Sequence, residues 1–156
     1  MIEIDIPGRR IYRFEHLVLD LNGTLSLDGV IVEGVPEKLK LLSGTINILI
    51  VTADTQGNAQ ELERNLQVKI HKISPGDERI QKLRLVRQLG SEATVSMGNG
   101  SNDASMLKES SLGICILGNE GASFDAMAHC DLVLPDINAA LDLLLKPQRL
   151  IATLRR

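Results

Sequence analysis

The feature of this sequence that most constrains its fold is an alternation between short, continuously apolar runs and longer amphipathic segments. The apolar runs predict strands at residues 16–21, 46–51, 68–73, 93–97, 112–116 and 131–134. The amphipathic segments predict helices at residues 36–43, 56–66, 77–89, 102–110, 121–129 and 136–145, with Pro36 in a first helical turn and Pro147 ending the last helix. Because strands that are apolar throughout are buried on both faces, the pattern predicts an α/β fold in three layers, a doubly wound parallel sheet between helices.

The first 15 residues have a different pattern. Residues 2–6 alternate between apolar and polar side chains, Pro7-Gly8 favours a turn, and a second short run follows at residues 11–14. This pattern predicts an N-terminal β-hairpin. The sequence has no linker, repeat or low-complexity segment, so we expect residues 1–156 to form one domain that buries roughly two-thirds of its unfolded surface.

The end of the first predicted core strand carries the most informative motif, Asp20-Leu21-Asn22-Gly23-Thr24-Leu25. Asp20 stands where a buried strand ends, which suits a carboxylate that attacks phosphorus. Gly23 lets backbone N–H groups close on phosphate oxygens, and Thr24 adds a hydroxyl donor. The same spacing also occurs in ordinary turns, so its meaning depends on what the other strands carry at their ends.

Residues of matching chemistry follow later in the chain. Thr52-Ala53-Asp54 comes after the next apolar run, Lys82 lies on a predicted helix, and Gly98-Asn99-Gly100-Ser101-Asn102-Asp103 comes after a later strand. Ligands of doubly wound sheets bind beyond the carboxyl ends of the parallel strands. We therefore expect Asp20, Thr52 and Asn99 to meet at one site.

Taken together, these motifs resemble those of the haloacid dehalogenase-like superfamily of phosphotransferases. The likeness is greatest to the phosphorylation domain of P-type ATPases, which carries D-K-T-G-T, T-G-D, a lysine and G-D-G-x-N-D in this order, and to the small soluble proteins related to that domain. It continues through residues 104–108 and 112–114 and more weakly through 128–134, so it covers roughly residues 16–135. The resemblance implies a haloacid dehalogenase-like Rossmannoid fold, and the short segments between the motifs leave no room for a cap domain.

The resemblance also implies a role for each matched residue. Asp20 would form an aspartyl phosphate, Thr52 would hydrogen-bond the transferring phosphoryl group, and Lys82 would neutralise charge on both. The implied ligands of Mg²⁺ are Asp20, the backbone carbonyl of Asn22, Asn99 and, through a water, Asp103. The residues implied to contact the phosphorylated substrate are Gly23, Thr24, Thr52, Ala53 and Asn102.

Two positions depart from the family pattern. Phosphatases of the family carry an Asp at the position of Asn22, which transfers a proton to the leaving group and then from water; its loss typically costs about 10² to 10⁴ in rate. ATPases have Thr there, so Asn22 permits phosphorylation but predicts slow hydrolysis. Asn99 replaces an Asp that ligates the metal, which removes a charge worth up to about 4 kcal/mol at roughly 4 Å.

Two function classes therefore stay open: a slow magnesium-dependent phosphatase or phosphotransferase, and a catalytically retired member that binds a phosphorylated ligand or a partner protein.

Some single residues have two interpretations. Asp54 is either a site residue or the cap of a helix beginning near Gln56. Arg79 and Lys72 are alternatives to Lys82 as the cation of the site. A receiver domain would also use an acceptor Asp and a Lys, but the nucleophile on the first core strand argues against that class.

The composition narrows the range of partners and locations. A formal net charge of −3 gives no electrostatic reason to expect nucleic-acid or membrane binding, and the aromatic residues, Tyr12, Phe14 and Phe124, offer no stacking platform. No apolar run reaches the length of a bilayer span, and residues 1–5 lack the pattern of a signal peptide. Cys115 and Cys130 lack metal-binding spacing, so we expect reduced thiols in a cytoplasmic protein.

The expected partner is a small phosphorylated substrate or a phosphoprotein. A further expectation is a homo-oligomer in which a neighbouring copy covers the open site.

Overall fold

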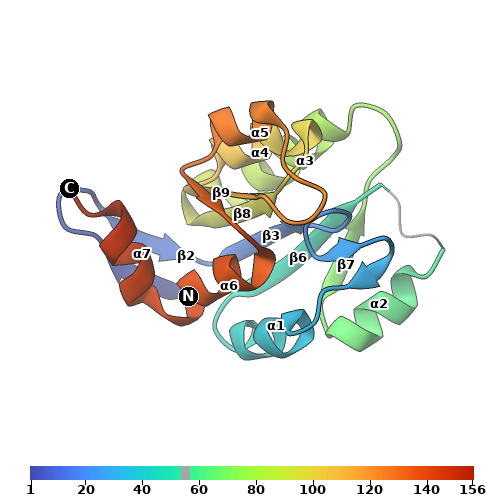
Figure 1. The fold of residues 1–156 in the computed structure, drawn as a ribbon, viewed down its shortest axis with the longest axis horizontal. Coiled ribbons are helices and arrows are strands. Elements are labelled where there is room, and N and C mark those ends of the chain that lie inside the picture. Colours follow the sequence, from blue (N-terminus) through green and yellow to red (C-terminus); the bar gives the residue numbers. More distant parts are fainter. Residues whose placement is uncertain (54–56) are drawn as a thin grey trace.

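The computed structural model describes residues 1–53 and 57–156. Its centre is a sheet of parallel strands in the order β10-β9-β8-β3-β6-β7 (Figure 1). These strands are β3 (His16–Asp20), β6 (Asn47–Thr52), β7 (Lys69–Lys72), β8 (Thr94–Gly98), β9 (Leu112–Ile116) and β10 (Leu132–Leu134). Each boundary lies within one residue of the predicted one, so the predicted parallel sheet is confirmed.

Helices cover both faces of the sheet, as Figure 1 shows. One layer contains α1 (Val35–Ser43), α2 (Ala59–Leu66) and α6 (Ile137–Leu145), and the other contains α3 (Glu78–Leu89), α4 (Ala104–Glu109) and α5 (Phe124–His129). The three-layer α/β fold is therefore confirmed. The helix predicted at 102–110 differs from the prediction, because the chain first makes a 3₁₀ turn at Ser101–Asp103 before α4 begins. The helix predicted at 121–129 begins at Phe124, since the side chain of Ser123 caps it by accepting a hydrogen bond from the N–H of Ala126.

Strand β3 shows why the core strands are apolar at every position. Leu17 and Leu19 lie in the cluster that includes residues of α1 and α6. Val18 points to the opposite face, where it packs in a cluster with Leu85 of α3 and Met106 of α4. Because successive side chains of a strand alternate between the two faces, helices on both faces require an apolar residue at each position.

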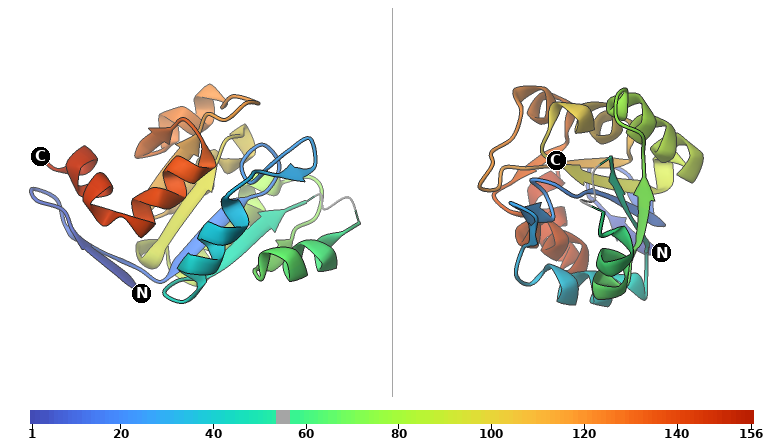
Figure 2. Two further views of the ribbon diagram at one scale, coloured as in Figure 1. Left: turned by 60° about the horizontal axis from the view of Figure 1, so that its bottom comes forward. Right: turned by 90° about the vertical axis from the view of Figure 1, so that its right-hand side faces the viewer.

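The N-terminal hairpin consists of β1 (Ile2–Asp5) and β2 (Ile11–Phe14), which pair in antiparallel fashion as predicted. A helix that the sequence analysis did not predict, α7 (Pro147–Leu154), packs against β1. Pro147 separates α6 from the following residues as expected, but it also occupies the first position of α7, where its missing N–H has no intrahelical partner to lose. The N–H of Arg156 donates to the carbonyl oxygen of Pro7 over 3.1 Å, so the C-terminal end lies beside the hairpin (Figure 2).

The segment between β3 and α1 is short. It contains one small antiparallel ribbon, formed by β4 (Ser26–Leu27) and β5 (Val30–Ile31), and no cap domain lies between the described ends of β3 and α1. The segment between β6 and α3, as far as residues 57–77 show, contains only α2 and β7. Within residues 1–53 and 57–156, these two segments therefore supply no lid domain over the carboxyl ends of the strands. No helix within the described residues is long and apolar enough to cross a membrane.

One close approach between layers generates a testable prediction about stability. A Cβ atom at Gly113 of β9 would lie 2.1 Å from the backbone carbonyl oxygen of Leu107 in α4. Gly113→Ala should therefore force α4 away from the sheet and lower the free energy of unfolding by about 3 kcal/mol, as measured by urea denaturation. Gly44→Ala is the matched control, because Gly44 has helical backbone angles and no atom within 4 Å of its added Cβ. A loss of stability at Gly113 no larger than at Gly44 would contradict this packing.

Candidate functional site

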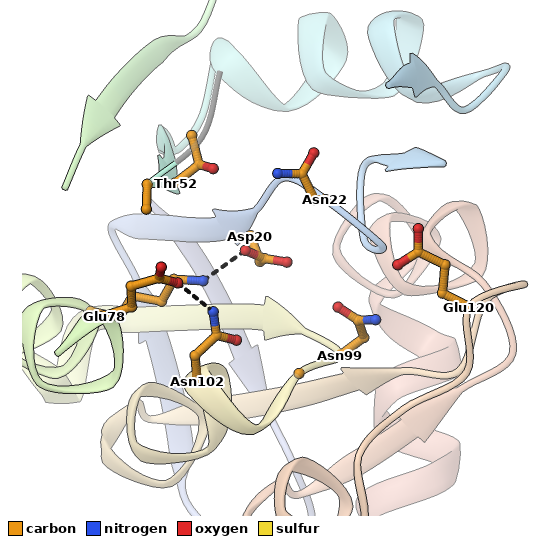
Figure 3. Close-up of a pocket in the computed structure, with 10 residues that line it drawn as sticks. Asp20, Asn22, Thr52, Glu78, Asn99, Asn102 and Glu120 are labelled. Carbon is orange, nitrogen blue, oxygen red and sulfur yellow. Dashed lines mark hydrogen bonds and ion pairs between the residues drawn. The ribbon is translucent and has the colours of Figure 1, made fainter. Parts of the chain in front are cut away.

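Asp20 is held at the carboxyl end of β3, at the floor of a pocket (Figure 3). The residue is only 6% exposed. The following turn closes tightly, because the N–H groups of Leu25 and Ser26 both donate to the carbonyl oxygen of Leu21. The turn returns the Thr24 hydroxyl to the aspartate, where it donates to Asp20 Oδ2 over 3.2 Å.

Gly23 is required by both the conformation and the crowding of this turn. Its φ of 80° lies in the left-handed region. A Cβ atom there would lie 2.5 Å from Oε2 of Glu120 and 2.6 Å from Nδ2 of Asn99. The glycine thus allows two side chains from other loops to approach the backbone beside Asp20.

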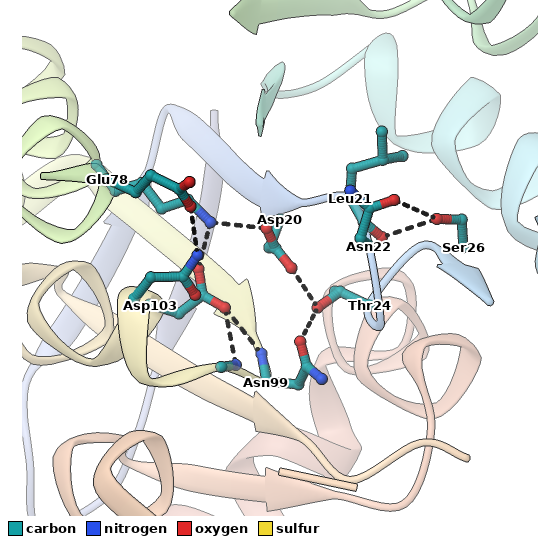
Figure 4. A network of polar contacts seen from close by, with 11 residues as sticks. Asp20, Leu21, Asn22, Thr24, Ser26, Glu78, Asn99 and Asp103 are labelled. Atoms are coloured by element: carbon teal, nitrogen blue, oxygen red, sulfur yellow. Dashed lines mark hydrogen bonds and ion pairs between the residues drawn. The ribbon is translucent and has the colours of Figure 1, made fainter. Parts of the chain in front are cut away.

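Lys82 links the two buried carboxylates of the site, those of Asp20 and Asp103, which Figure 4 labels. Its Nζ lies 2.7 Å from Oδ1 of Asp20 and 2.6 Å from Oδ1 of Asp103. The side chain of Lys82 is 1% exposed and that of Asp103 is 0% exposed. The other two candidate cations lie elsewhere: Arg79 pairs with Asp125 over 2.6 Å, and Lys72 is exposed on β7.

Burial and ion pairing have opposite effects on the pKa of Asp20 and on the pKa of Lys82. Burial, reinforced by the charge of Asp103, raises the pKa of Asp20 to about 7 against the lowering effect of Lys82. Burial by itself would lower the pKa of Lys82, but the two carboxylates raise it above its ordinary value. The lysine is therefore an ammonium ion, and one positive charge faces two carboxyl groups.

Asp103 has a structural role in addition to its ion pair. Its Oδ2 accepts hydrogen bonds from the N–H of Asn99 at 3.1 Å and from that of Gly100 at 3.0 Å. These bonds fix the loop that follows β8. Asn99 is thereby directed toward the first motif, and its Oδ1 accepts a hydrogen bond from the Thr24 hydroxyl at 3.3 Å.

The pocket above Asp20 has a volume of about 380 Å³. It is lined by Asp20, Asn22, Thr52, Ala53, Glu78, Lys82, Asn99, Gly100, Asn102 and Glu120. Among the described residues, all the predicted site residues except Gly23, Thr24 and Asp103 thus line one pocket. Thr24 contacts Asp20, Gly23 lies beneath Glu120 and Asn99, and Asp103 lies behind Lys82. Asp54 and the predicted start of its helix at Gln56 lie outside the described residues.

Two pocket residues, Glu78 and Glu120, were missed by the sequence analysis. Glu78 begins α3, and its Oε2 accepts a hydrogen bond from Nδ2 of Asn102 at 2.8 Å. Glu120 lies in the loop after β9, on the side of the pocket where Asn99 is found (Figure 3). Neither glutamate belongs to a sequence motif that would have pointed to the site. The one available signal was the spacing of Glu78, which lies four residues before Lys82 in α3 and therefore on the same face of that helix.

Comparison with known proteins first gives sequence relatives. No family model matches the chain. The uncharacterized protein MJ0073 of Methanocaldococcus jannaschii is 42% identical over 92 residues, a region that covers 56% of this chain and 99% of that protein. The uncharacterized protein MJ0072 of the same organism is 51% identical over 39 residues, which covers 25% of this chain and 89% of that protein.

Solved structures share the fold at low sequence identity. The cobalt-bound deoxy-D-mannose-octulosonate 8-phosphate phosphatase of Haemophilus influenzae has a TM-score of 0.71 and 14% identity, covering 92% of this chain and 94% of that one. The 3-deoxy-D-manno-octulosonate 8-phosphate phosphatase of Moraxella catarrhalis, in complex with magnesium and phosphate ions and a sugar acid, has a TM-score of 0.69 and 19% identity, covering 91% and 94%. The catalytic domain of the CPx-ATPase CopB-B has a TM-score of 0.60 and 21% identity, covering 74% of this chain and 46% of that one. The chain therefore belongs to the family of the protein MJ0073, and its fold is that of the haloacid dehalogenase superfamily.

Proposed function

We propose that this protein is a phosphatase or phosphotransferase that depends on a divalent cation and forms an aspartyl phosphate on Asp20. The observation that carries this proposal is the buried ion-pair group, in which Lys82 holds Asp20 at the floor of a pocket. Two buried carboxylates with one ammonium are costly for stability, and such arrangements are typical of reactive sites. The pocket volume of about 380 Å³ fits a small phosphorylated molecule.

In the proposed reaction, a carboxylate oxygen of Asp20 attacks the phosphorus atom of the substrate. A P–O bond to Asp20 forms while the P–O bond to the leaving group breaks, and the leaving oxygen keeps the electron pair. Lys82 stabilises negative charge on the transferring group, and the Thr24 hydroxyl orients Asp20 through its 3.2 Å hydrogen bond to Oδ2. Water then attacks phosphorus, which releases phosphate and restores the carboxylate.

The chemistry of the pocket fits a hard divalent cation. Next to Asp20 the pocket presents oxygen donors, including Oδ1 of Asn99, and the Thr24 hydroxyl joins these two residues. Three lining side chains are carboxylates, those of Asp20, Glu78 and Glu120, whereas Lys82 is the one ammonium among the lining residues that the structure describes. A bound Mg²⁺ would neutralise charge on the phosphoryl oxygens, and Asp20, Asn22 and Asn99 would hold it. Two of the structural neighbours contain cobalt or magnesium.

The two amides favour a second candidate function, in which the protein binds a phosphorylated ligand or a partner protein without turnover. The Oδ1 atom of Asn22 lies 3.4 Å from the Ser26 hydroxyl, and an amide cannot transfer the proton that hydrolysis requires. The cytoplasmic location, a small phosphorylated substrate or a phosphoprotein as the partner, and a second copy of the chain covering the site stay predictions.

The first prediction concerns the covalent intermediate. Incubation with acetyl phosphate and Mg²⁺ should label the protein at Asp20, because the nucleophile and its lysine are in place while the acid for hydrolysis is absent. Intact-mass and peptide-mass measurements would detect the added phosphoryl group. The Asp20→Asn variant should show none; labelling that persists in it, or that never occurs in the parent, would exclude Asp20 as the nucleophile.

A second prediction concerns the step that limits turnover. Asn22→Asp places a carboxylic acid in the lining of the pocket, so hydrolysis of an aryl phosphate should rise by about 10² to 10⁴ at saturating Mg²⁺. Asn65→Asp on α2 makes the same chemical change at an exposed position outside the pocket and should leave the rate unchanged. If neither variant turns over faster than the parent, the missing acid is not what limits the protein, and the binding function becomes the better proposal.

A third prediction concerns the energetics of the ion-pair group. Lys82→Met removes the ammonium and leaves the carboxyl groups of Asp20 and Asp103 buried without a cation, which should lower the free energy of unfolding by about 3–5 kcal/mol. Lys72→Met, at an exposed position on β7, should change it by less than about 0.5 kcal/mol. Urea denaturation of both variants without metal would measure the difference, and equal effects would show that the buried pairs do not stabilise the fold.

A further inference from the structure

Among the carboxylates that line the pocket, Glu120 is the one whose side chain has no polar partner among the described residues, since Asp20 pairs with Lys82 and Glu78 with Asn102. Within residues 1–53 and 57–156 its side chain makes no hydrogen bond and no ion pair, and it is exposed on the loop after β9. It nevertheless lies against the first motif, since its Oε2 is 2.5 Å from where a Cβ atom of Gly23 would be. Oδ1 of Asn99 lies 3.0 Å from the same point. A carboxylate oxygen of Glu120 and the side-chain amide of Asn99 thus meet beside Gly23, in the turn that follows Asp20.

Asn99 also holds the loop that carries Glu120. Its Nδ2 donates to the carbonyl oxygen of Gly121 at 3.1 Å, and its backbone carbonyl accepts from the N–H of Ser123 at 2.8 Å. The first of these bonds needs a donor on the side chain, which an amide has and a carboxylate lacks. The amide of Asn99 therefore adds no charge to the pocket, and it anchors the loop that carries the carboxylate of Glu120.

Glu78, the other glutamate of the pocket, is placed differently. Its Oε2 accepts a hydrogen bond from Asn102, and both side chains lie on the side of the pocket opposite to Glu120 (Figure 3). Glu78 and Glu120 carry the same charge into the same pocket, but only Glu120 lies beside Asn99 and Gly23. Comparing the loss of charge at Glu120 with the same loss at Glu78 therefore distinguishes direct ligation of a cation from a general effect of negative charge in the pocket.

We infer that Glu120 supplies the anionic oxygen ligand of the divalent cation in this pocket, in place of the carboxylate that position 99 lacks. The inference rests on the proposed function, because it concerns the cation of the same site. Glu120 binds the cation together with Asp20, and Asn99 positions the Glu120 loop through Gly121. Hard cations such as Mg²⁺ and Mn²⁺ take carboxylate and amide oxygens of this kind.

The test is a titration of the full chain with Mg²⁺, and in parallel with Mn²⁺, by calorimetry in the absence of any phosphorylated compound. Glu120→Gln keeps the size of the side chain and removes its charge, and we expect it to weaken cation affinity about 10- to 100-fold. Glu78→Gln makes the same change across the pocket and should weaken it less than about threefold. Glu120→Asp, which keeps the charge on a shorter side chain, should give an intermediate affinity. Metal-free melting curves should be unchanged for the Glu120 variants, because the exposed side chain makes no contact that holds the fold.

The outcomes separate this inference from the proposed function. Equal weakening by Glu120→Gln and Glu78→Gln, no weakening by Glu120→Gln, or no cation binding by the parent would overturn the role of Glu120. If Glu120→Gln alone weakens binding but acetyl phosphate leaves Asp20 unlabelled, the ligand role stands and the phosphoryl-transfer proposal fails. If Asp20 is labelled in the presence of Mg²⁺ while Glu120→Gln binds the cation normally, the reaction stands and the ligand role fails.

Discussion

The interaction on which the rest of the site depends is the contact of one lysine with two carboxylates. Asp20 comes from the end of β3, Lys82 from α3, and Asp103 from the loop after β8, and the three side chains are almost completely buried. An unpaired charge at this depth would cost several kcal/mol, so each of the three residues stabilises the burial of the other two. The ion pairs of the site therefore also help to hold α3 on the sheet.

Much of the fold could be predicted because its strands are apolar at every position. Strand β3 packs against helices on both faces, so Leu17, Val18 and Leu19 are all apolar. This continuous apolar run predicts both ends of β3 to within one residue. What could not be predicted depends on contacts between distant segments. α7 is a short helix that begins at Pro147, and its packing on β1 could not be inferred from either segment alone. The 3₁₀ turn before α4 likewise follows from hydrogen bonds of Asp103 to the preceding backbone.

Some residues of the site could likewise be predicted from the strand pattern, whereas others depend on contacts between distant segments. Asp20, Thr52 and Asn99 could be expected together, because parallel strands bring their carboxyl ends to one edge. Lys82 was one of several candidate cations in the sequence, and its distances to Asp20 and Asp103 distinguish it from Arg79, which pairs with Asp125. Glu120 lies in a loop without periodicity, so only the three-dimensional structure reveals that it approaches Gly23.

The charges of the pocket constrain the order in which ligands bind. The ammonium of Lys82 is already shared between two carboxylates, while Glu78 and Glu120 add negative charge around the pocket. A phosphate group that entered this pocket alone would meet more negative than positive charge at short range, where the effective dielectric is low. A divalent cation reverses that balance, so we expect the cation to bind before the phosphorylated ligand. Under the proposed function, amides at positions 22 and 99 would limit the repulsion among carboxylates in the metal-free protein, and they would also weaken ligation and slow proton transfer. If the proposed reaction takes place, we therefore expect the amides at positions 22 and 99 both to slow it and to lower the electrostatic cost of the metal-free pocket.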